Sequence, residues 1–413
     1  MHRFLWQGAS LAAFLVPGLA LWVPSGYSYG AAVMVLLSLA SLGAWAGRPV
    51  PRQAWALAAA FAAMAAIWLL DVGAAWGWGS FDKPLKYLIA LPCLFWVLAF
   101  APRTAWLWAG LVVGACGSGL VALYQVLGLH WPRAAGYTNA IQYGNLSLLL
   151  ALMCGGVLVV HWPCWSRARR GLWGLGLLLG AVGSLLSQSR GGWLALVIVL
   201  PLCAGLLARL GQRRAWWGVA WLALAALLLS QTPAVHERIQ EAQHEVETYR
   251  AQGDGATSVG HRLSHWSLAW AMGRDRPWTG WGRAGYEAEK ARRVAAGEAH
   301  PMVLQYGHAH NDALDLFAKR GLLGVLVLLL FYGVPLALFW PSRARVTDAQ
   351  GQWDREALSL RLVGVLLPLS YASFGLTQAF LAHNSGNMFY LFMCLLVSGA
   401  LWGRHPGAGP KAS

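Results

Sequence analysis

The chain has 413 residues, of which 58% are hydrophobic and only 11% are charged, and its formal net charge is +15. The mean hydropathy is +0.49, and several apolar runs approach the ~20 residues that a helix needs to cross a bilayer. These values exclude an ordinary soluble fold. The six cysteines lie in or beside apolar segments, in no spacing that indicates a disulfide framework or a metal motif.

Twelve apolar segments follow one another and predict an all-α polytopic membrane protein with about twelve transmembrane helices. The segments are residues 4–23, 30–46, 54–70, 84–100, 104–127, 140–160, 171–187, 191–208, 215–232, 321–340, 358–376 and 386–403. The longest polar stretch, residues 233–320, falls between the ninth and tenth segments. We expect it to form one large loop with helices of its own, inserted into a single integral membrane domain of residues 1–413.

The positive charges of the short connections indicate how the chain is oriented. Lys and Arg are concentrated in the connections that share a side with the N-terminus, among them Arg167, Arg169 and Arg170. This distribution predicts that both termini are cytoplasmic and that the 233–320 loop lies outside. The basic excess therefore sets the topology, with anionic membrane lipids as its neighbours, and does not indicate a nucleic-acid partner.

Four basic residues fall on the side where this rule disfavours them: Lys83, Lys86, Arg133 and Arg190. With Arg262, His308 and His310, they would gather at the outer mouth of the helix bundle. A cationic outer cavity beside lipid suits an anionic substrate that is tethered to the membrane.

Arg190 belongs to the segment Ser187–Trp193, in which two glycines follow the arginine. We expect the glycine pair to permit a tight turn that brings Arg190 to the cavity, where its guanidinium could hold a phosphate oxygen. The alternative is an arginine that anchors the helix end among the headgroups. Arg262, near the start of a predicted helix in the large loop, could likewise bind an anion or pair with a loop glutamate.

Lys83 and Lys86 precede the fourth span, and on a helix that starts near Pro84 they could share a face. They would bind either the substrate or lipid phosphates at the interface. Arg133 lies in a polar, glycine-containing entry to the sixth span. Such an entry is typical of irregular backbone that lines a cavity, and equally of a plain surface loop.

His308 and His310 lie just ahead of a predicted helix that starts near Asn311, since Asn311 and Asp312 are good N-caps. The positive end of a helix favours a neutral imidazole, and a neutral histidine can accept a proton. The alternative is a metal site, but no third ligand of convincing spacing follows the pair. The pair is therefore a candidate for a general base, and its spacing does not favour a metal site.

Three ordered segments resemble the O-antigen ligase family, within the wider group of Wzy-type polymerases and bacterial protein O-oligosaccharyltransferases. They are Ser187–Gly191 at the end of a span, the block Arg262…Trp266…Pro277–Gly282 in the large loop, and His308–Asp312 followed by Gly321–Gly324 before the next span. The chain departs from the family at Lys319, near which members often carry an acidic residue. We expect a structural role for this position.

The resemblance implies a glycosyltransferase of lipopolysaccharide biosynthesis, built like the C-type membrane glycosyltransferases. Such a ligase transfers O-antigen from undecaprenyl pyrophosphate to a sugar hydroxyl of lipid A–core, at the periplasmic face of the bacterial inner membrane. It uses no metal or nucleotide cofactor. Arg190 and Arg262 would stabilise the diphosphate, and His310 would take the proton of the acceptor in an inverting displacement. The substrate-binding residues would be Lys83, Lys86, Arg133, His308 and Asn311.

Other functions remain open at this point. An O-antigen polymerase or a protein O-oligosaccharyltransferase would use the same chemistry with a different acceptor. The compact outer loop, with no second large outer loop, favours a ligase over a polymerase. A transporter is less favoured, because transporters usually show repeat symmetry and ionisable groups near the midplane.

Overall fold

The computed structural model describes residues 2–71, 78–230, 233–252, 257–348 and 350–403. Throughout these ranges every regular element is a helix, apart from one isolated antiparallel bridge between Thr347 and Trp353. The all-α prediction is confirmed.

Each of the twelve apolar segments coincides with a helix. These helices are α1 (His2–Leu19), α2 (Gly26–Ala40) with the short α3 (Leu42–Trp45), α4 (Arg52–Leu69), α5 (Trp78–Ala99), α6 (Thr104–Leu123), α7 (Ala140–His161), α8 (Arg167–Leu186), α9 (Arg190–Arg209), α10 (Ala215–Ser230), α14 (Asp312–Phe339), α15 (Arg355–Phe374) and α16 (Asn384–Trp402). The last two residues of the predicted 215–232 segment lie outside the described ranges. Helices satisfy all their interior backbone groups within one segment, which lipid requires.

Seven of the described helices are long and apolar enough to cross a membrane: α4, α6 with the π-helical turn that ends at Gly128, α7, α9, α14, α15 and α16. The chain is therefore a multi-pass membrane protein. Twelve crossings, a single membrane domain over residues 1–413 and a periplasmic 233–320 loop stay predictions.

Small residues bring neighbouring helices into close backbone contact, as is common in membrane bundles. A Cβ atom on Gly110 of α6 would lie 2.9 Å from the Cα of Phe14 in α1, and one on Gly114 would lie 2.9 Å from the carbonyl carbon of Pro17. Helices α7, α15 and α16 are buried along most of their length. They form the interior of the bundle, against which the outer helices pack.

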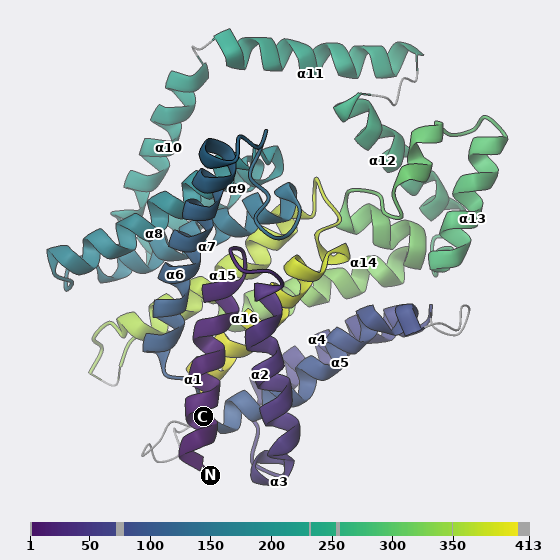
Figure 1. Cartoon of the computed structure of the whole chain (residues 1–413). Coiled ribbons are helices and arrows are strands. Elements are labelled where there is room, and N and C mark those ends of the chain that lie inside the picture. Colours follow the sequence, from purple (N-terminus) through teal and green to yellow (C-terminus); the bar gives the residue numbers. More distant parts are fainter. Residues whose placement is uncertain (1, 72–77, 231–232, 253–256, 349, 404–413) are drawn as a thin grey trace.

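The polar stretch between α10 and α14 folds into α11 (Pro233–Gln252), α12 (Ser258–Asp275), α13 (Gly282–Ala295) and the 3-10 helix η3 (Pro301–Gln305). Residues 253–256 of this stretch lie outside the described ranges. Helices α11, α12 and α13 lie at the end of the bundle opposite to the start of α1 (Figure 1). A small second core joins α12 and α13 to α14, formed by Leu268, Ala269, Met272, Tyr286, Val303, Ala309 and Ala318.

The block Pro277–Gly282 packs against a break inside α14 and is hydrogen-bonded to it. At Gly321 the helix has φ 61° and ψ −155°. The backbone amides that follow the break donate to carbonyl groups of the loop instead of to the helix. The amide of Leu322 donates to the carbonyl of Pro277 over 2.6 Å, and the amide of Trp281 donates to the carbonyl of Ala318 over 3.0 Å. Two motifs that are far apart in the sequence thus form one structural unit.

Replacing Gly321 by alanine should lower the free energy of unfolding by about 2–4 kcal/mol. Its backbone conformation is accessible only to glycine, and a Cβ atom would lie 2.5 Å from the carbonyl oxygen of Pro277 and 2.6 Å from that of Trp278. The measurement is the midpoint of thermal unfolding in detergent. Gly333→Ala on the same helix is the matched control, because a Cβ atom there meets nothing within 4 Å. Equal midpoints for the two variants would contradict this account.

Candidate functional site

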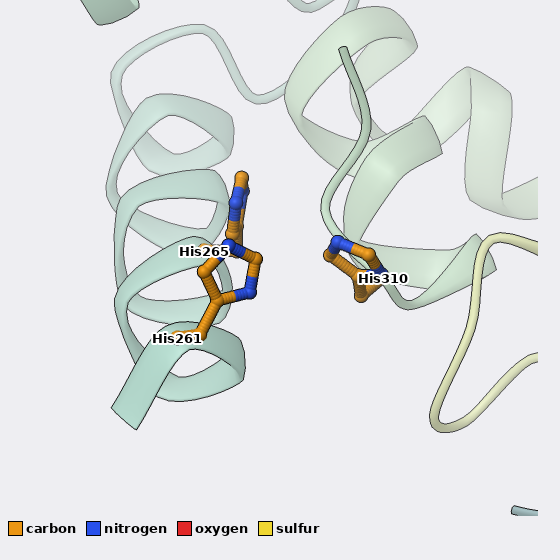
Figure 2. A group of neighbouring side chains, drawn as sticks. All are labelled: His261, His265 and His310. Atoms are coloured by element: carbon orange, nitrogen blue, oxygen red, sulfur yellow. The ribbon is translucent and has the colours of Figure 1, made fainter. Parts of the chain in front are cut away.

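Four histidines meet where the large loop faces the start of α14; we call His261, His265, His308 and His310 the histidine cluster. His261 and His265 are four residues apart in α12 and therefore share one face of that helix. Their ring centroids lie 5.4 and 5.3 Å from that of His310, which in turn lies 4.4 Å from His308. Figure 2 shows the two α12 rings facing His310 across the gap between the segments.

His310 has an uncommon backbone conformation. Its ring is hydrogen-bonded to a side chain that was not predicted from the sequence. Its φ is 51°, in the left-handed region that residues other than glycine rarely adopt. Its Nδ1 lies 2.8 Å from Oε1 of Gln378, whose Nε2 lies 3.2 Å from Nε2 of His383. An amide oxygen can only accept, so Nδ1 carries the hydrogen. In the neutral ring Nε2 is then an acceptor, and it is buried without a hydrogen-bond partner among the described residues.

Three buried side chains hold the backbone just before His310. Lys290 donates to the carbonyl of Tyr306 over 2.7 Å, and Lys319 donates to the carbonyl of Gly307 over 2.8 Å. Oδ1 of Asp315 accepts from the amide of Ala309 over 3.0 Å. Lys319 also binds both oxygens of Asp315, at 2.7 and 2.8 Å. This geometry supports the structural role that we expected for Lys319.

Burial keeps the histidine cluster neutral. Burial, followed by the neighbouring histidines, lowers the pKa of His265 to about 3; burial and then His310 lower the pKa of His308 to about 3. Burial also lowers the pKa of His261 and of His310. The rings are therefore in their proton-accepting form at neutral pH.

Arg190 and Arg262 come from different segments and lie close to each other. Arg190 is the first residue of α9 and is exposed, whereas Arg262 is in the first turns of α12 and is half-buried. Burial and then the charge of Arg190 lower the pKa of the Arg262 guanidinium. In the described part of the chain neither forms a salt bridge. The carboxylate of Glu245 raises the pKa of Arg262 and is therefore nearby, but it forms no salt bridge with Arg262 among the described residues. Two neighbouring guanidinium groups that are not engaged in salt bridges suit an anion with several oxygens.

We expected the glycine pair to make the turn that presents Arg190, and this prediction was wrong. Gln188 makes the turn instead. Gln188 has φ 55°, while Gly191 and Gly192 lie within the first turn of α9. The glycines instead permit close packing: a Cβ atom on Gly191 would overlap Thr377, and one on Gly192 would lie 2.8 Å from Oδ1 of Asn145. The turn is thus fixed against α7 and against the segment that carries Gln378.

The two lysines of α5 face different surroundings, and the helix begins at Trp78 rather than near Pro84 as expected. The ammonium group of Lys83 lies 4.1 Å from the ring centroid of Trp68. Burial of His383, and then the positive charge of Lys83, lower the pKa of His383. Lys83 therefore lies near the histidines. Lys86 forms an ion pair with Asp82 and donates to Oδ1 of Asn384 over 2.7 Å.

Arg133 is exposed on a loop beside the turn of Arg190. Gln188 reaches this loop with Nε2, which donates to the carbonyl of Pro132 over 2.9 Å. No interaction joins Arg133 to the histidine cluster within the described ranges.

Asn311 is the N-cap of α14, so the predicted start of this helix is confirmed. Its Oδ1 accepts from the amide of Leu314 over 3.0 Å, and its Nδ2 donates to the carbonyl of Leu376 over 3.0 Å. The side chain therefore ties the start of α14 to the segment before α16.

Four residues at the site were not predicted from the sequence: His261, His265, Gln378 and His383. A signal existed for the first two, because the spacing His261-x-x-x-His265 within a predicted helix places both rings on one face. Nothing in the local sequence marks Gln378, which reaches His310 from a segment 68 residues away.

Comparison with known proteins gives one family model and one relative. Residues 174–329 match the family model described as O-antigen ligase. A protein of Haemophilus influenzae, described as uncharacterized, is 26% identical over 322 residues, which cover 76% of this chain and 79% of the relative. The matched segment contains Arg190, Arg262, His310 and the interlocked motifs of the loop and α14. The similarity to the O-antigen ligase family lies in this segment, which makes up less than half of the chain.

Proposed function

We propose that the chain is an O-antigen ligase, which transfers O-antigen from undecaprenyl pyrophosphate to a sugar hydroxyl of lipid A–core. The observation that carries this proposal is the pair Arg190 and Arg262 beside His310. It combines a site for a diphosphate with a nitrogen that can accept the proton of a hydroxyl group. The similarity of residues 174–329 to the O-antigen ligase family, whose enzymes act on lipid-linked glycans, supports the class of donor.

In this proposal the arginines stabilise the leaving group. The bond between the anomeric carbon and the phosphate oxygen breaks, and negative charge develops on the diphosphate. Two guanidinium groups in a partly desolvated site offset this charge without reorganisation. Lys83, partly buried near the histidines, adds a third positive charge.

His310 is the general base. As the acceptor oxygen bonds to the anomeric carbon, its proton passes to Nε2 of His310, and attack opposite to the leaving group inverts the configuration. His308, 4.4 Å away between ring centroids, orients the acceptor hydroxyl. Arg133 contacts substrate at the rim. Lys86 and Asn311, whose polar atoms are already bonded within the protein, contribute through the positions of α16 and α14.

The reaction takes place on the periplasmic side of the inner membrane in this proposal, with both termini in the cytoplasm. The charge distribution of the short connections supports this orientation. The gathering of the site at the bundle end that carries α11, α12 and α13 supports it as well (Figure 1).

The test is a transfer assay with purified protein in EDTA, in which lipid-linked O-antigen is offered with one of three acceptors. Glycan attached to lipid A–core supports the ligase. Growth of the chain from two lipid-linked repeats would identify a polymerase, and glycan on a peptide would identify a protein O-oligosaccharyltransferase. Loss of donor without any transfer product would count against all three.

Gln378 acts in this proposal as a positioning residue. Replacing it by leucine should lower kcat by about 10- to 100-fold with little change in KM, because the tautomer and orientation of His310 are no longer fixed. Steady-state kinetics of the transfer assay measure both constants. Gln378→Glu should recover most of kcat, since a carboxylate oxygen accepts the same hydrogen bond from Nδ1. A glutamate variant as slow as the leucine variant would contradict this role.

A further inference from the structure

We propose that His261, His265 and His310 form a binding site for Zn²⁺, and that zinc bound there inhibits glycan transfer reversibly. The proposal that zinc binds here is argued from the positions of the three rings alone. The inhibitory part rests on the proposed function, because zinc would occupy Nε2 of His310, the nitrogen that accepts the proton of the acceptor.

The three rings already converge. One nitrogen of each lies within 4.8 Å of a nitrogen of the other two, and Figure 2 shows the rings of α12 on the side that faces His310. Zn–N bonds of about 2.1 Å in a tetrahedral site place ligand nitrogens about 3.4 Å apart. Small side-chain rotations therefore complete the set, which leaves the fourth position for water.

The ring nitrogens lack other partners. Both nitrogens of His265, which is 0% exposed, have no hydrogen-bond partner among the residues the structure describes. The same holds for Nε2 of His261 and Nε2 of His310. Burying an unpaired polar group costs free energy, and a shared cation would satisfy these lone pairs together.

The surroundings of His310 are those of a metal ligand. Its other nitrogen donates to Oε1 of Gln378 over 2.8 Å, the kind of outer contact that fixes the tautomer of ligating histidines. His261 and His310 are only partly buried, although their Nε2 atoms are enclosed, so side chains must move for an ion to enter. An all-imidazole set suits Zn²⁺, whereas Mg²⁺ and Ca²⁺ prefer oxygen ligands.

Positive charges nearby limit the affinity. Arg262 acts on His261 and His310, and Lys290 acts on His265, in each case lowering the pKa of the imidazole. The same charges oppose a bound cation. Zinc would therefore exchange with solution rather than remain as a permanent structural ion, as reversible inhibition requires.

The binding test uses the full chain in detergent, freed of metal with EDTA and titrated with ZnCl₂ in a calorimeter. Wild type should bind one equivalent, and Co²⁺ in its place should give the visible absorption of a tetrahedral site. His265→Ala should bind Zn²⁺ at least about tenfold more weakly. The matched control is His244→Ala, an exposed histidine of α11 in the same loop, which should bind like wild type.

Absence of binding to wild type, or equal affinity of wild type and His265→Ala, would overturn the site. Thermal unfolding of each variant checks that it folds. If His265→Ala does not, His261→Ala, whose ring is partly exposed, replaces it in the same comparison.

The activity test compares each protein with and without zinc. Transfer by wild type should fall as zinc saturates the calorimetric site and return with EDTA, whereas His261→Ala should keep its own rate at the same zinc concentration. Zinc that binds without slowing transfer, or that speeds it, would overturn the inhibitory role. If no preparation transfers glycan at all, the proposed function fails, and the calorimetric comparison still decides the site.

Discussion

His310→Ala is expected to lower kcat for glycan transfer by about 10²- to 10⁴-fold while binding of the lipid-linked donor stays unchanged. The variant removes Nε2, which is the nitrogen placed to accept the proton of the acceptor. The arginines that hold the diphosphate remain. The measurement pairs the transfer assay with a binding assay for the donor alone.

A second substitution separates the chemistry from the backbone. His310 has φ 51°, and asparagine tolerates the left-handed region better than alanine does. His310→Asn should therefore fold as wild type does and still lose activity to a similar extent. Full activity in either variant would end the assignment of the base, while leaving the family and the donor class untouched.

Asp315→Ala is expected to lower the free energy of unfolding by about 3–5 kcal/mol. The side chains of Asp315 and Lys319 are 7% and 4% exposed, so removing the carboxylate leaves a buried ammonium group without its ion-pair partner. The substitution also removes the acceptor for the amide of Ala309, next to His310. The midpoint of thermal unfolding in detergent measures the loss.

The double variant Asp315→Ala with Lys319→Met is the control for this prediction. It removes both charges, and replacing a buried pair by apolar groups is far less costly than breaking it. The double variant should unfold at a higher temperature than Asp315→Ala, although the carbonyl of Gly307 loses its donor. A double variant that is less stable than the single one would mean that the pair does not act as described.

Much of the fold follows from local patterns in the sequence. Apolar runs of sufficient length predict the helices, and the capping side chain of Asn311 marks the start of α14. The site residues Arg190, Arg262 and His310 could be selected because each belongs to a motif of the family. Their gathering at one end of the bundle was predicted, but the contact of the two α12 histidines with His310 could not be, since it depends on how α12 is placed over the bundle.

The errors have equally physical causes. Lys86 looked available from its spacing to Lys83, but an ion pair with Asp82 and a bond to Asn384 engage it. The Gly191–Gly192 pair was assigned to a turn, although glycine also serves where two backbones must approach closely. His261 and His265 were overlooked because a metal set was sought along the local sequence of His308 and His310. The two histidines that face His310 lie on another helix, α12.

The contact of Pro277–Gly282 with the break in α14 limits how the large loop can be engineered. The large loop cannot be exchanged as an independent module between relatives, because its last turn completes the hydrogen bonding of a membrane helix. A Cβ atom on Gly280 would lie 2.7 Å from the carbonyl oxygen of Lys319, so the fit depends on both partners. A transplant of the loop should therefore extend through Gly324. A shorter graft would separate Arg262 from the backbone that positions His310.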